Sequence, residues 1–570
     1  MSILSISNCI FKNNSADYGG AINSIHSNLT VTDSIFIENS TNETRGGNGG
    51  GIYFGGDITP SYITGCQFRR NRAAGGGSGA AIYCDINPVV ITGCVFDGNY
   101  TGNDGGGGGI YLSKSTPSLL KDLIITNNKS KRGGGICCFE TSMELNNCEI
   151  RGNIVDSRNP EAYGGGIFFW GRSNPVVRNC KISENGLINS LHSFGGGICC
   201  SQYSQPEIIN CEVTNNRSLW GSGIACNSSQ TSIKGCLITG NTAIDHPEQS
   251  SAGGGIYSGG SKPVEISDSI ISDNSADFGS GIHCFDGSNA KIKNCLISNN
   301  EAFKSGGALY SDGSSPTLIN CTLIDNSATR FNGVAAENGG TASISSSILW
   351  EYGGNTFGGS GELDIICSDV REGFFGENIF SIDPLFVSGP WGDYYLSHFD
   401  AGQSEDSSCI DAGANTAERF DLDFMTTRTD GVFDTGVVDL GYHYPPNVLF
   451  DLYISPLKEA YGSHDTIEVN LDIRTGNKFN HVDIYFILNT PEGEVFSGMA
   501  WGEGLCPMIS DFKLGEYLEV VGVEVLKFRL PSETLPISGY GTYTFAIAGT
   551  DAGTFDIVSN LALTSFCYLE

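Results

Sequence analysis

The chain has 570 residues, of which 78 are glycine and 20 are cysteine, and its formal net charge is −32. This much glycine excludes a helical bundle, and this much negative charge argues against nucleic acid or an anionic membrane as a partner. No stretch is long and apolar enough to predict a transmembrane helix, while the length allows several domains.

One sequence unit returns along the first 350 residues, most clearly in Gly195–Asn216, GGGICCSQYSQPEIINCEVTNN. Its second-half cysteine, Cys211, defines a register position that recurs every 25 to 33 residues. The register positions are 9, 34, 66, 94, 123, 148, 180, 211, 236, 269, 295, 321 and 347. A period of this length, kept over a dozen copies, predicts a solenoid.

Each copy carries the same local signals around the register position. Apolar residues stand two places after it and three places before it, which indicates two short strands with a bend between them. The residue just before it is Asn, Gly or Asp in twelve of thirteen copies, so we expect a left-handed corner there. An asparagine five places after it recurs from Asn14 to Asn326, and we expect these amides to hydrogen-bond along the stack.

The other half of each copy carries glycines followed by an isoleucine, as in GGAI at Gly19–Ile22. Length varies only between the register position and this isoleucine, which places all variable loops on one edge. The fold class predicted is all-β: a right-handed parallel β-helix of about twelve coils, each with three short strands, over residues 1–350.

The pairing of F-x-x-N (Phe11–Asn14, Phe36–Asn39) with GGAI resembles the repeats of polymorphic outer-membrane proteins, which are pectate-lyase-like β-helices on bacterial surfaces. The resemblance covers roughly residues 1–350. It implies the fold strongly and the function weakly, because the same fold hosts lyases, hydrolases, adhesins and tail spikes. The sequence predicts no C-terminal membrane barrel of the kind that such adhesins usually carry, so we do not expect their mode of anchoring to apply.

One place after the glycine-half isoleucine, a row of residues should point outward, one coil apart at about 4.8 Å. Aromatic rings there could bind a sugar or a protein partner, or could stack for stability alone. We therefore single out six residues as a candidate ligand-binding or interface strip: Tyr53, Tyr83, Tyr111, Phe168, Tyr257 and Tyr310.

The long loops of the variable edge, Thr41–Gly50, Ile154–Gly166, Gly186–Gly197 and Thr242–Gly255, are candidate recognition sites. They carry His192 and His246, and aromatic residues stand just before the glycines: Tyr18, Tyr163, Phe194, Trp220 and Phe278. These aromatics either contact a ligand or cover the glycine-rich strands.

Five further cysteines share a coil with a register cysteine. If the two positions touch across the narrow interior, we expect up to five disulfides: Cys84–Cys94, Cys138–Cys148, Cys200–Cys211, Cys226–Cys236 and Cys284–Cys295. They would require an oxidising compartment. The alternative is a stack of reduced cysteines that act as small apolar core residues.

Met1 begins almost inside a coil, with neither a signal peptide nor an amphipathic cap. A trimmed chain, an incomplete gene, or an open coil covered by another subunit would each explain this. The last case predicts a homo-oligomer or a head-to-tail polymer.

Beyond Ser347 the repeat decays, and residues 351–446 are predicted to be irregular last coils with a cap. Cys367 and Cys409 are a plausible pair there. No cofactor is expected: five acidic residues could hold Ca²⁺, but their spacing matches no known loop, and a solvated acidic cap is the simpler interpretation. These residues are Asp421, Asp423, Asp430, Asp434 and Asp439.

Residues 447–570 show about seven alternating runs, which predicts an immunoglobulin-like β-sandwich that Cys506 and Cys567 could bridge.

The function predicted is a non-enzymatic extracellular or cell-surface protein, either an adhesin for a glycan or other surface ligand or a structural subunit. The alternative is a lyase or hydrolase of acidic polysaccharide, which needs clustered carboxylates. The nearest such pairs are Asp57 with Asp85 and Asp286 with Asp312, and neither has an evident basic partner.

Overall fold

The computed structural model describes residues 2–445 apart from 43–45, 57–59, 103, 116, 158–159 and 245. Beyond residue 449 it describes the backbone of strands only. The chain divides into two compact units, Met1–Thr429 with Phe433–Tyr444, and Asp430–Val432 with Pro445–Glu570.

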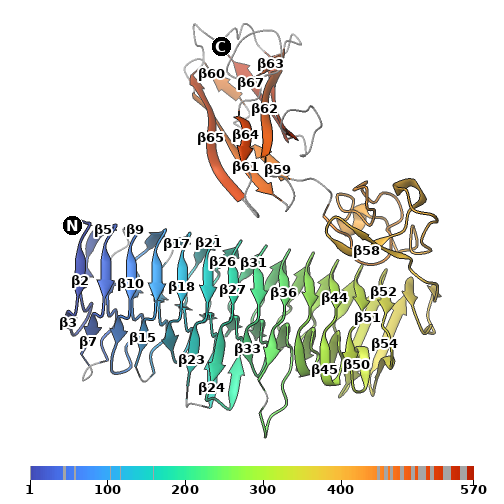
Figure 1. The fold of residues 1–570 in the computed structure, drawn as a ribbon, viewed down its shortest axis with the longest axis horizontal. Coiled ribbons are helices and arrows are strands. Elements are labelled where there is room, and N and C mark those ends of the chain that lie inside the picture. Colours follow the sequence, from blue (N-terminus) through green and yellow to red (C-terminus); the bar gives the residue numbers. More distant parts are fainter. Residues whose placement is uncertain are drawn as a thin grey trace. The chain divides into compact units, whose positions relative to one another are not determined.

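The first unit is a stack of parallel coils (Figure 1), most of which have four short strands. One coil comprises β5 (Ser27–Thr32), β6 (Ile35–Ile37), β7 (Ser40–Thr41) and β8 (Ile52–Gly55). The expectation of three strands per coil is therefore wrong. The additional strand, represented here by β7, has only two residues in most coils, too few for an apolar alternation to be visible in the sequence.

Equivalent strands of successive coils form four long parallel sheets. Sheet A has 14 strands from β1 (Ser2–Ser7) to β54 (Glu362–Ile366), and sheet B has 15 from β2 (Ile10–Lys12) to β56 (Ile379–Phe380). Sheet C has 12 strands from β3 (Ser15–Ala16) to β49 (Ser327–Ala328), and sheet D has 13 from β4 (Ile22–Ile25) to β53 (Asn355–Gly359). Four parallel sheets wound by one continuous chain are a β-helix.

The corner between sheets A and B is left-handed, as predicted. All thirteen residues that precede a register position have φ between 47° and 63°, including Ser346, the one member that is not Asn, Asp or Gly. A second left-handed corner, between sheets B and C, was not predicted from the sequence. Its twelve residues run from Asn13 to Asp325. Because Glu38, Arg70 and Glu184 are among them, the preference of such corners for Asn, Asp and Gly is not visible at this position of the repeat.

The predicted asparagine ladder is present and nearly all of it is buried. Asn216 is typical: its Nδ2 donates to Oδ1 of Asn241 at 3.0 Å and to the Ile182 carbonyl at 2.8 Å. Its own Oδ1 accepts from both the backbone N–H and Nδ2 of Asn185, each at 3.0 Å. Since each amide closes four hydrogen bonds, the ladder satisfies the backbone of the corner inside the stack.

The ladder ends on a carboxylate that the repeat did not predict. Oε2 of Glu351 accepts from the backbone N–H of Asn326 at 2.7 Å, and Oε1 accepts from its Nδ2 at 2.9 Å. Burial raises the pKa of Glu351 to about 8, although both hydrogen bonds act in the opposite direction.

Glycine is required where the chain enters sheet D. Gly195 has φ 70°, and a Cβ at this position would come within 2.2 Å of the Ile198 carbonyl oxygen. The next glycine, Gly196, would bring a Cβ within 2.5 Å of the Ser222 carbonyl oxygen in the following coil. The GGxI signature therefore reflects close backbone approach both within a coil and between coils.

The predicted intra-coil disulfides are not formed. All eighteen cysteines of the described part of the chain are thiols, and all but Cys9 are buried. The register cysteines lie next to those of neighbouring coils: the backbone N–H of Cys66 lies 3.3 Å from Sγ of Cys94, and that of Cys211 lies 3.5 Å from Sγ of Cys236. In a stack of coils, each residue lies next to the residue at the same position of the adjacent coil. The disulfide prediction compared two positions within one coil and did not take this into account. The predicted pairs that are absent are Cys84–Cys94, Cys138–Cys148, Cys200–Cys211, Cys226–Cys236, Cys284–Cys295 and Cys367–Cys409.

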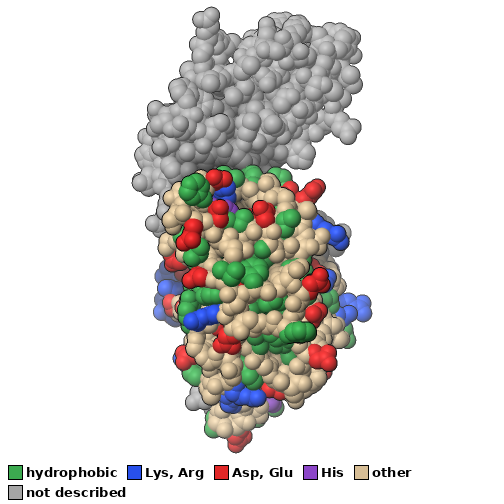
Figure 2. All heavy atoms as spheres, turned by 90° about the vertical axis from the view of Figure 1, so that its right-hand side faces the viewer, with side chains coloured by type: hydrophobic (Ala, Val, Ile, Leu, Met, Phe, Trp, Pro, Cys, Tyr) green, Lys and Arg blue, Asp and Glu red, His purple; other side chains and the backbone are tan. Residues whose placement is uncertain are grey.

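After the last coils the chain folds back over the outer face of sheet B. Tyr395, Leu440 and Tyr444 pack there in one apolar cluster with Leu296 and Trp350, among others. The hairpin β57 (Phe386–Gly389) and β58 (Gly392–Leu396) contributes to this cover. Figure 2 looks onto the end of the coil stack nearest this segment, where hydrophobic side chains lie among polar ones and charged side chains surround them.

Corner asparagines hold this returning segment by its backbone. The Oδ1 atom of Asn294 accepts from the His443 N–H at 2.7 Å, and its Nδ2 donates to the His443 carbonyl at 3.1 Å. One coil further, Nδ2 of Asn320 donates to the Asp439 carbonyl at 3.0 Å. The asparagines of the left-handed corner therefore have two roles: they form the bend, and their side chains bind the backbone of the returning segment.

The second unit contains two sheets. β59 (Phe450–Ile454), β61 (Thr466–Thr475) and β65 (Glu519–Arg529) form one. The other has the order β60 (Ala460–Gly462), β67 (Ala562–Leu569), β66 (Gly541–Asp551), β62 (His481–Asn489) and β63 (Val495–Ser497), with β64 (Ile509–Lys513) also pairing with β62. The predicted Cys506–Cys567 bridge lies outside the residues whose side chains are described.

Candidate ligand pocket on the loop edge

The variable loops between sheets C and D are ordered by a ladder of their own. β24 (Glu161–Tyr163) and β29 (His192–Phe194) pair in parallel. Single bridges continue the ladder from Phe194 through Trp220 and Ala252 to Phe278. The long loops therefore form a regular edge of the stack on which side chains are held in fixed places.

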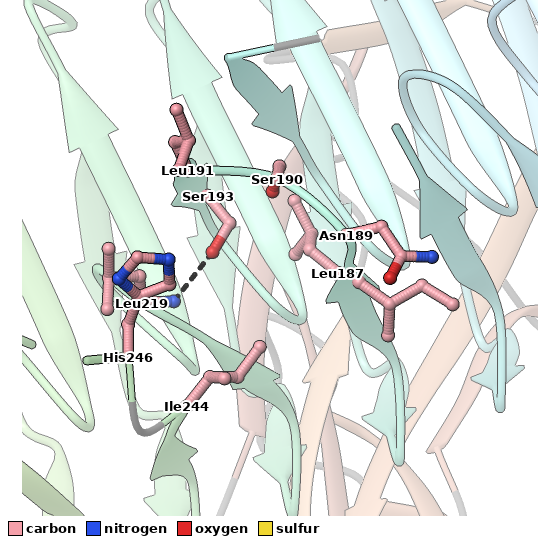
Figure 3. Close-up of a pocket in the computed structure, with 9 residues that line it drawn as sticks. Leu187, Asn189, Ser190, Leu191, Ser193, Leu219, Ile244 and His246 are labelled. Atoms are coloured by element: carbon pink, nitrogen blue, oxygen red, sulfur yellow. Dashed lines mark hydrogen bonds between the residues drawn. The ribbon is translucent and has the colours of Figure 1, made fainter. Parts of the chain in front are cut away.

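A pocket of about 370 Å³ opens on this edge (Figure 3). One wall comes from β28 (Gly186–Ile188) and the loop that follows it, and the other comes from the next two coils. The lining residues are Leu187, Ile188, Asn189, Ser190, Leu191, Ser193, Leu219, Ile244 and His246. This volume lies in the range typical of pockets for small ligands or for one or two side chains of a partner.

The pocket is lined mainly by aliphatic side chains. Leu187 and Leu219 form its floor and are almost fully buried, whereas Ile188 and Leu191 are 42% and 48% exposed at its rim. Leu187 also belongs to a small apolar cluster with Val155 and Ala162, which fixes the floor to the preceding coil. Exposed aliphatic groups beside a concave surface favour an apolar ligand group.

Three polar groups at the pocket differ in whether they are already bonded. Oγ of Ser193 accepts from the Leu219 N–H at 2.8 Å, so this hydroxyl ties two coils together. Nδ1 of His246 accepts from the Glu248 N–H at 3.2 Å, which leaves Nε2 as the ring nitrogen that can donate to a ligand. Oγ of Ser190 is buried and has no hydrogen-bond partner among the described residues. The hydrogen-bonding capacity of the Ser190 hydroxyl is therefore not used by the described residues.

Aromatic side chains next to the lining residues connect the coils that form the pocket. The rings of His192 and Trp220 stack with centroids 5.2 Å apart, and Nε1 of Trp220 donates to the Ser250 carbonyl at 3.1 Å. This hydrogen bond joins the loop after Ile244 to the preceding coil, so the pocket walls belong to one connected structure.

The predicted outward strip is one continuous row along sheet D, but it is unevenly exposed. Tyr53, Tyr83 and Tyr111 are half-buried and stacked, with ring centroids 5.4 and 5.2 Å apart. Their ring faces are occupied by one another, so a sugar could reach only ring edges and hydroxyl groups. Burial raises the pKa of all three phenols.

The later members of the strip are buried beneath other aromatic residues. Phe168, Tyr257 and Tyr310 are at most 8% exposed. Tyr163 stacks on Phe168 at 5.1 Å, and Phe278 packs on Tyr310 at 4.9 Å. The aromatics that precede the glycines therefore cover sheet D in these coils, which was one of the two roles considered for them.

Three of the five acidic residues considered for Ca²⁺ have separate partners. Asp421 pairs with Lys293 at 2.9 Å, Asp434 with His443 at 2.7 Å, and Asp439 with His398 at 3.6 Å. No group of three metal-ligating side chains occurs in the part of the chain that the structure describes. The two helical turns in that part, η1 (Phe399–Ala401) and η2 (Glu418–Phe420), have three residues each, far too few to cross a membrane.

Of the carboxylates considered for catalysis, Asp85 and Asp312 are the last residues of sheet D strands, and Asp286 follows such a strand directly. Asp286 and Asp312 are neighbours in adjacent coils, with the Asp286 N–H donating to the Asp312 carbonyl at 3.1 Å. Oδ1 of Asp312 accepts from Nδ2 of Asn338 at 2.7 Å. Asp57, the partner considered for Asp85, lies outside the described residues.

Comparisons with known proteins agree with this architecture. Residues 159–246 and 237–370 match the family model described as right handed beta helix region. Residues 122–138 match the Chlamydia polymorphic membrane protein repeat. No curated protein and no solved structure matches the chain. The chain thus contains a right-handed parallel β-helix with repeats of the polymorphic-membrane-protein type, as the motifs predicted.

Proposed function

We propose that this protein acts at a cell surface or outside the cell as a non-enzymatic recognition protein of the adhesin type. The repeat match at residues 122–138 supports a surface location, because it belongs to membrane proteins by its description. The rigid coil stack, with its loops ordered along one edge, supports a role in presenting a binding site.

The observation that carries this proposal is the pocket between Leu187 and His246. It combines aliphatic walls, an unbonded buried hydroxyl at Ser190 and the His246 Nε2 donor. This set suits an aliphatic side chain of a partner protein together with the backbone amide beside it. Such a ligand would bury its apolar group against Leu191 and Leu219 and pair its polar atoms with Ser190 and His246.

A binding experiment with matched variants tests the assignment. Fluorescently labelled full chain is titrated onto cultured epithelial cells, with N-acetyl-leucine amide as a soluble competitor. We expect saturable binding that the competitor reduces and that Leu191→Asp weakens at least tenfold. The control is Leu237→Asp, which changes a 36% exposed leucine on sheet B, outside the pocket. Equal binding by both variants would overturn the role of the pocket.

We further propose that strands β59–β67 form an immunoglobulin-like sandwich. Strands β59, β61 and β65 form one sheet, and β62, β66 and β67 are neighbours in the other. This division of the strands supports the proposed topology. Its role would be to separate the β-helix from whatever the chain is attached to.

Two other possibilities stay predictions. Head-to-tail assembly would use the strand edges β1–β4 as its interface, and sedimentation velocity over a wide concentration range tests it. Cleavage of acidic polysaccharide would release unsaturated uronates or reducing ends, and Asp286→Ala should then abolish the product.

A further inference from the structure

A second surface site lies on the turns between sheets D and A, and it shares no residue with the loop-edge pocket. The turn that follows β30 (Ile198–Ser201) carries Tyr203, and the turn that follows β25 (Ile167–Trp170) in the preceding coil carries Arg172. With Asn174 and Gln205, these residues line a hollow of about 340 Å³.

The backbone at Tyr203 holds its ring outward at an energetic cost. Gln202 and Tyr203 are consecutive left-handed residues with φ 52° and 67°, a conformation that a bulky aromatic residue rarely adopts. The turn is fixed by the Tyr203 N–H, which donates to the Ser228 carbonyl at 2.9 Å, and by the Gln205 N–H, which donates to the Ser173 carbonyl at 2.8 Å. The result is a tyrosine that is 62% exposed, the most exposed tyrosine among the described residues. Strain of this kind is concentrated at functional sites.

Two cations flank this ring on a chain whose net charge is −32. Nζ of Lys262 lies 5.6 Å from the centre of the Tyr203 ring, and Arg172 lines the hollow beside it. Neither cation forms an ion pair with another described residue. Glu140, on the equivalent turn one coil before Arg172, is paired with Lys114 at 3.7 Å. The local charge is therefore opposite in sign to that of the protein as a whole.

The remaining side chains of the hollow can recognise hydroxyl groups. Asn174 and Gln205 are exposed, and their side-chain amides make no hydrogen bond with another described residue. Each amide provides two donors and one acceptor. An exposed aromatic face, two free amides and a guanidinium group are complementary to a sugar ring that bears a carboxylate.

We propose that Arg172, Asn174, Tyr203, Gln205 and Lys262 form a binding site for a carboxylated saccharide unit, of the uronate or sialate class. The C–H face of the sugar packs on the Tyr203 ring. Its carboxylate pairs with the planar fork of Arg172, which matches a carboxylate in two-point geometry better than a lysine does. Lys262 adds charge at the other side of the ring, and the two amides bind ring hydroxyls.

The test is a titration of the full chain with defined probes, followed by saturation-transfer NMR and calorimetry. The probes are a hyaluronan tetrasaccharide, whose only charged groups are carboxylates, a heparin tetrasaccharide, which carries sulfates as well as carboxylates, neutral chitotetraose and a tetraglutamate peptide. We expect the hyaluronan tetrasaccharide to bind and chitotetraose not to bind. If the heparin fragment binds more strongly than the hyaluronan tetrasaccharide and still does so in Arg172→Gln, the binding reflects charge attraction alone and the proposal is overturned. The proposal is also overturned if tetraglutamate binds and the hyaluronan tetrasaccharide does not.

The variants separate loss of the site from loss of the fold. Tyr203→Gly removes the ring at a position whose φ of 67° glycine adopts without strain, so it should not destabilise the turn. We expect Tyr203→Gly and Arg172→Gln each to weaken hyaluronan binding about tenfold or more, which corresponds to about 1.4 kcal/mol. Arg217→Gln, an exposed cation of sheet C, should leave it unchanged. Undiminished binding by Tyr203→Gly, or an equal loss in Arg217→Gln, would refute the site. Leu191→Asp should have no effect on it, which keeps this result independent of the proposed pocket function.

Discussion

The substitution Asn216→Ala tests whether the asparagine ladder holds the coil stack together. It removes four hydrogen bonds and leaves the Asn185 N–H and one Asn185 Nδ2–H buried without partners. A buried polar group left unpaired costs about 1–3 kcal/mol, so the two donors alone predict a loss of about 4 kcal/mol in the free energy of unfolding.

The first rung of the ladder provides an internal comparison. Asn14 is exposed, and its side chain makes a single hydrogen bond, from Nδ2 to Oδ1 of Asn39 at 2.8 Å. Asn39 keeps its bond from the Asn14 backbone N–H when the side chain is removed. Asn14→Ala should therefore cost no more than about 1 kcal/mol.

The assay is urea unfolding of the full chain, followed by the fluorescence of the tryptophans, four of which lie in the β-helix unit. With a slope of roughly 4 kcal/mol per molar urea, Asn216→Ala should lower the midpoint by about 1 M. Asn215→Gly, next to it at a left-handed corner, controls for local backbone effects and should change the midpoint little. If Asn216→Ala lowers the midpoint no more than Asn14→Ala does, the ladder is not a main stabilising feature.

Three further predictions concern the end of the ladder, the returning segment and the thiols. Because burial raises the pKa of Glu351 to about 8 from 4.5, the folded state holds a proton that the unfolded state has lost between these values. Stability should therefore fall as pH rises through this window, by at most about 4 kcal/mol between pH ~5 and ~8. Urea midpoints at the two pH values measure this fall, and Glu351→Gln should reduce it; an unchanged pH dependence in that variant would contradict the assignment. Asn294→Ala removes both hydrogen bonds to the His443 backbone and should speed proteolytic cleavage within residues 380–444, whereas Asn210→Ala, at the same corner in an earlier coil, should not. In the native protein Cys9 is the exposed thiol among the eighteen described, and burial raises the pKa of Cys138 and Cys200. Alkylation of the native protein should therefore modify one thiol rapidly, and this rapid reaction should be absent in Cys9→Ser. Alkylation under denaturing conditions without reductant should modify all eighteen thiols. If Cys200 and Cys211 both stayed unmodified, the intra-coil disulfide between them would be present after all.

The amino-acid sequence determined the features that repeat from coil to coil. The left-handed corner at Asn210 and its equivalents, the ladder through Asn216 and the tight glycines before Ile198 could each be inferred from residue type and spacing. These features depend on the backbone of one coil and on the same position in the next, so a regular period is sufficient to predict them.

Only the tertiary structure decided which side chains meet when they come from different positions of the repeat. Cys211 lies against Cys236 of the next coil, and Phe168 is buried under Tyr163 from a variable loop. The pocket at Ser190 needs loops from several coils, and the docking of His443 on Asn294 joins residues 149 positions apart. Contacts of this kind depend on loop conformation and on how the chain returns after the last coil, and neither has a period that the sequence could reveal.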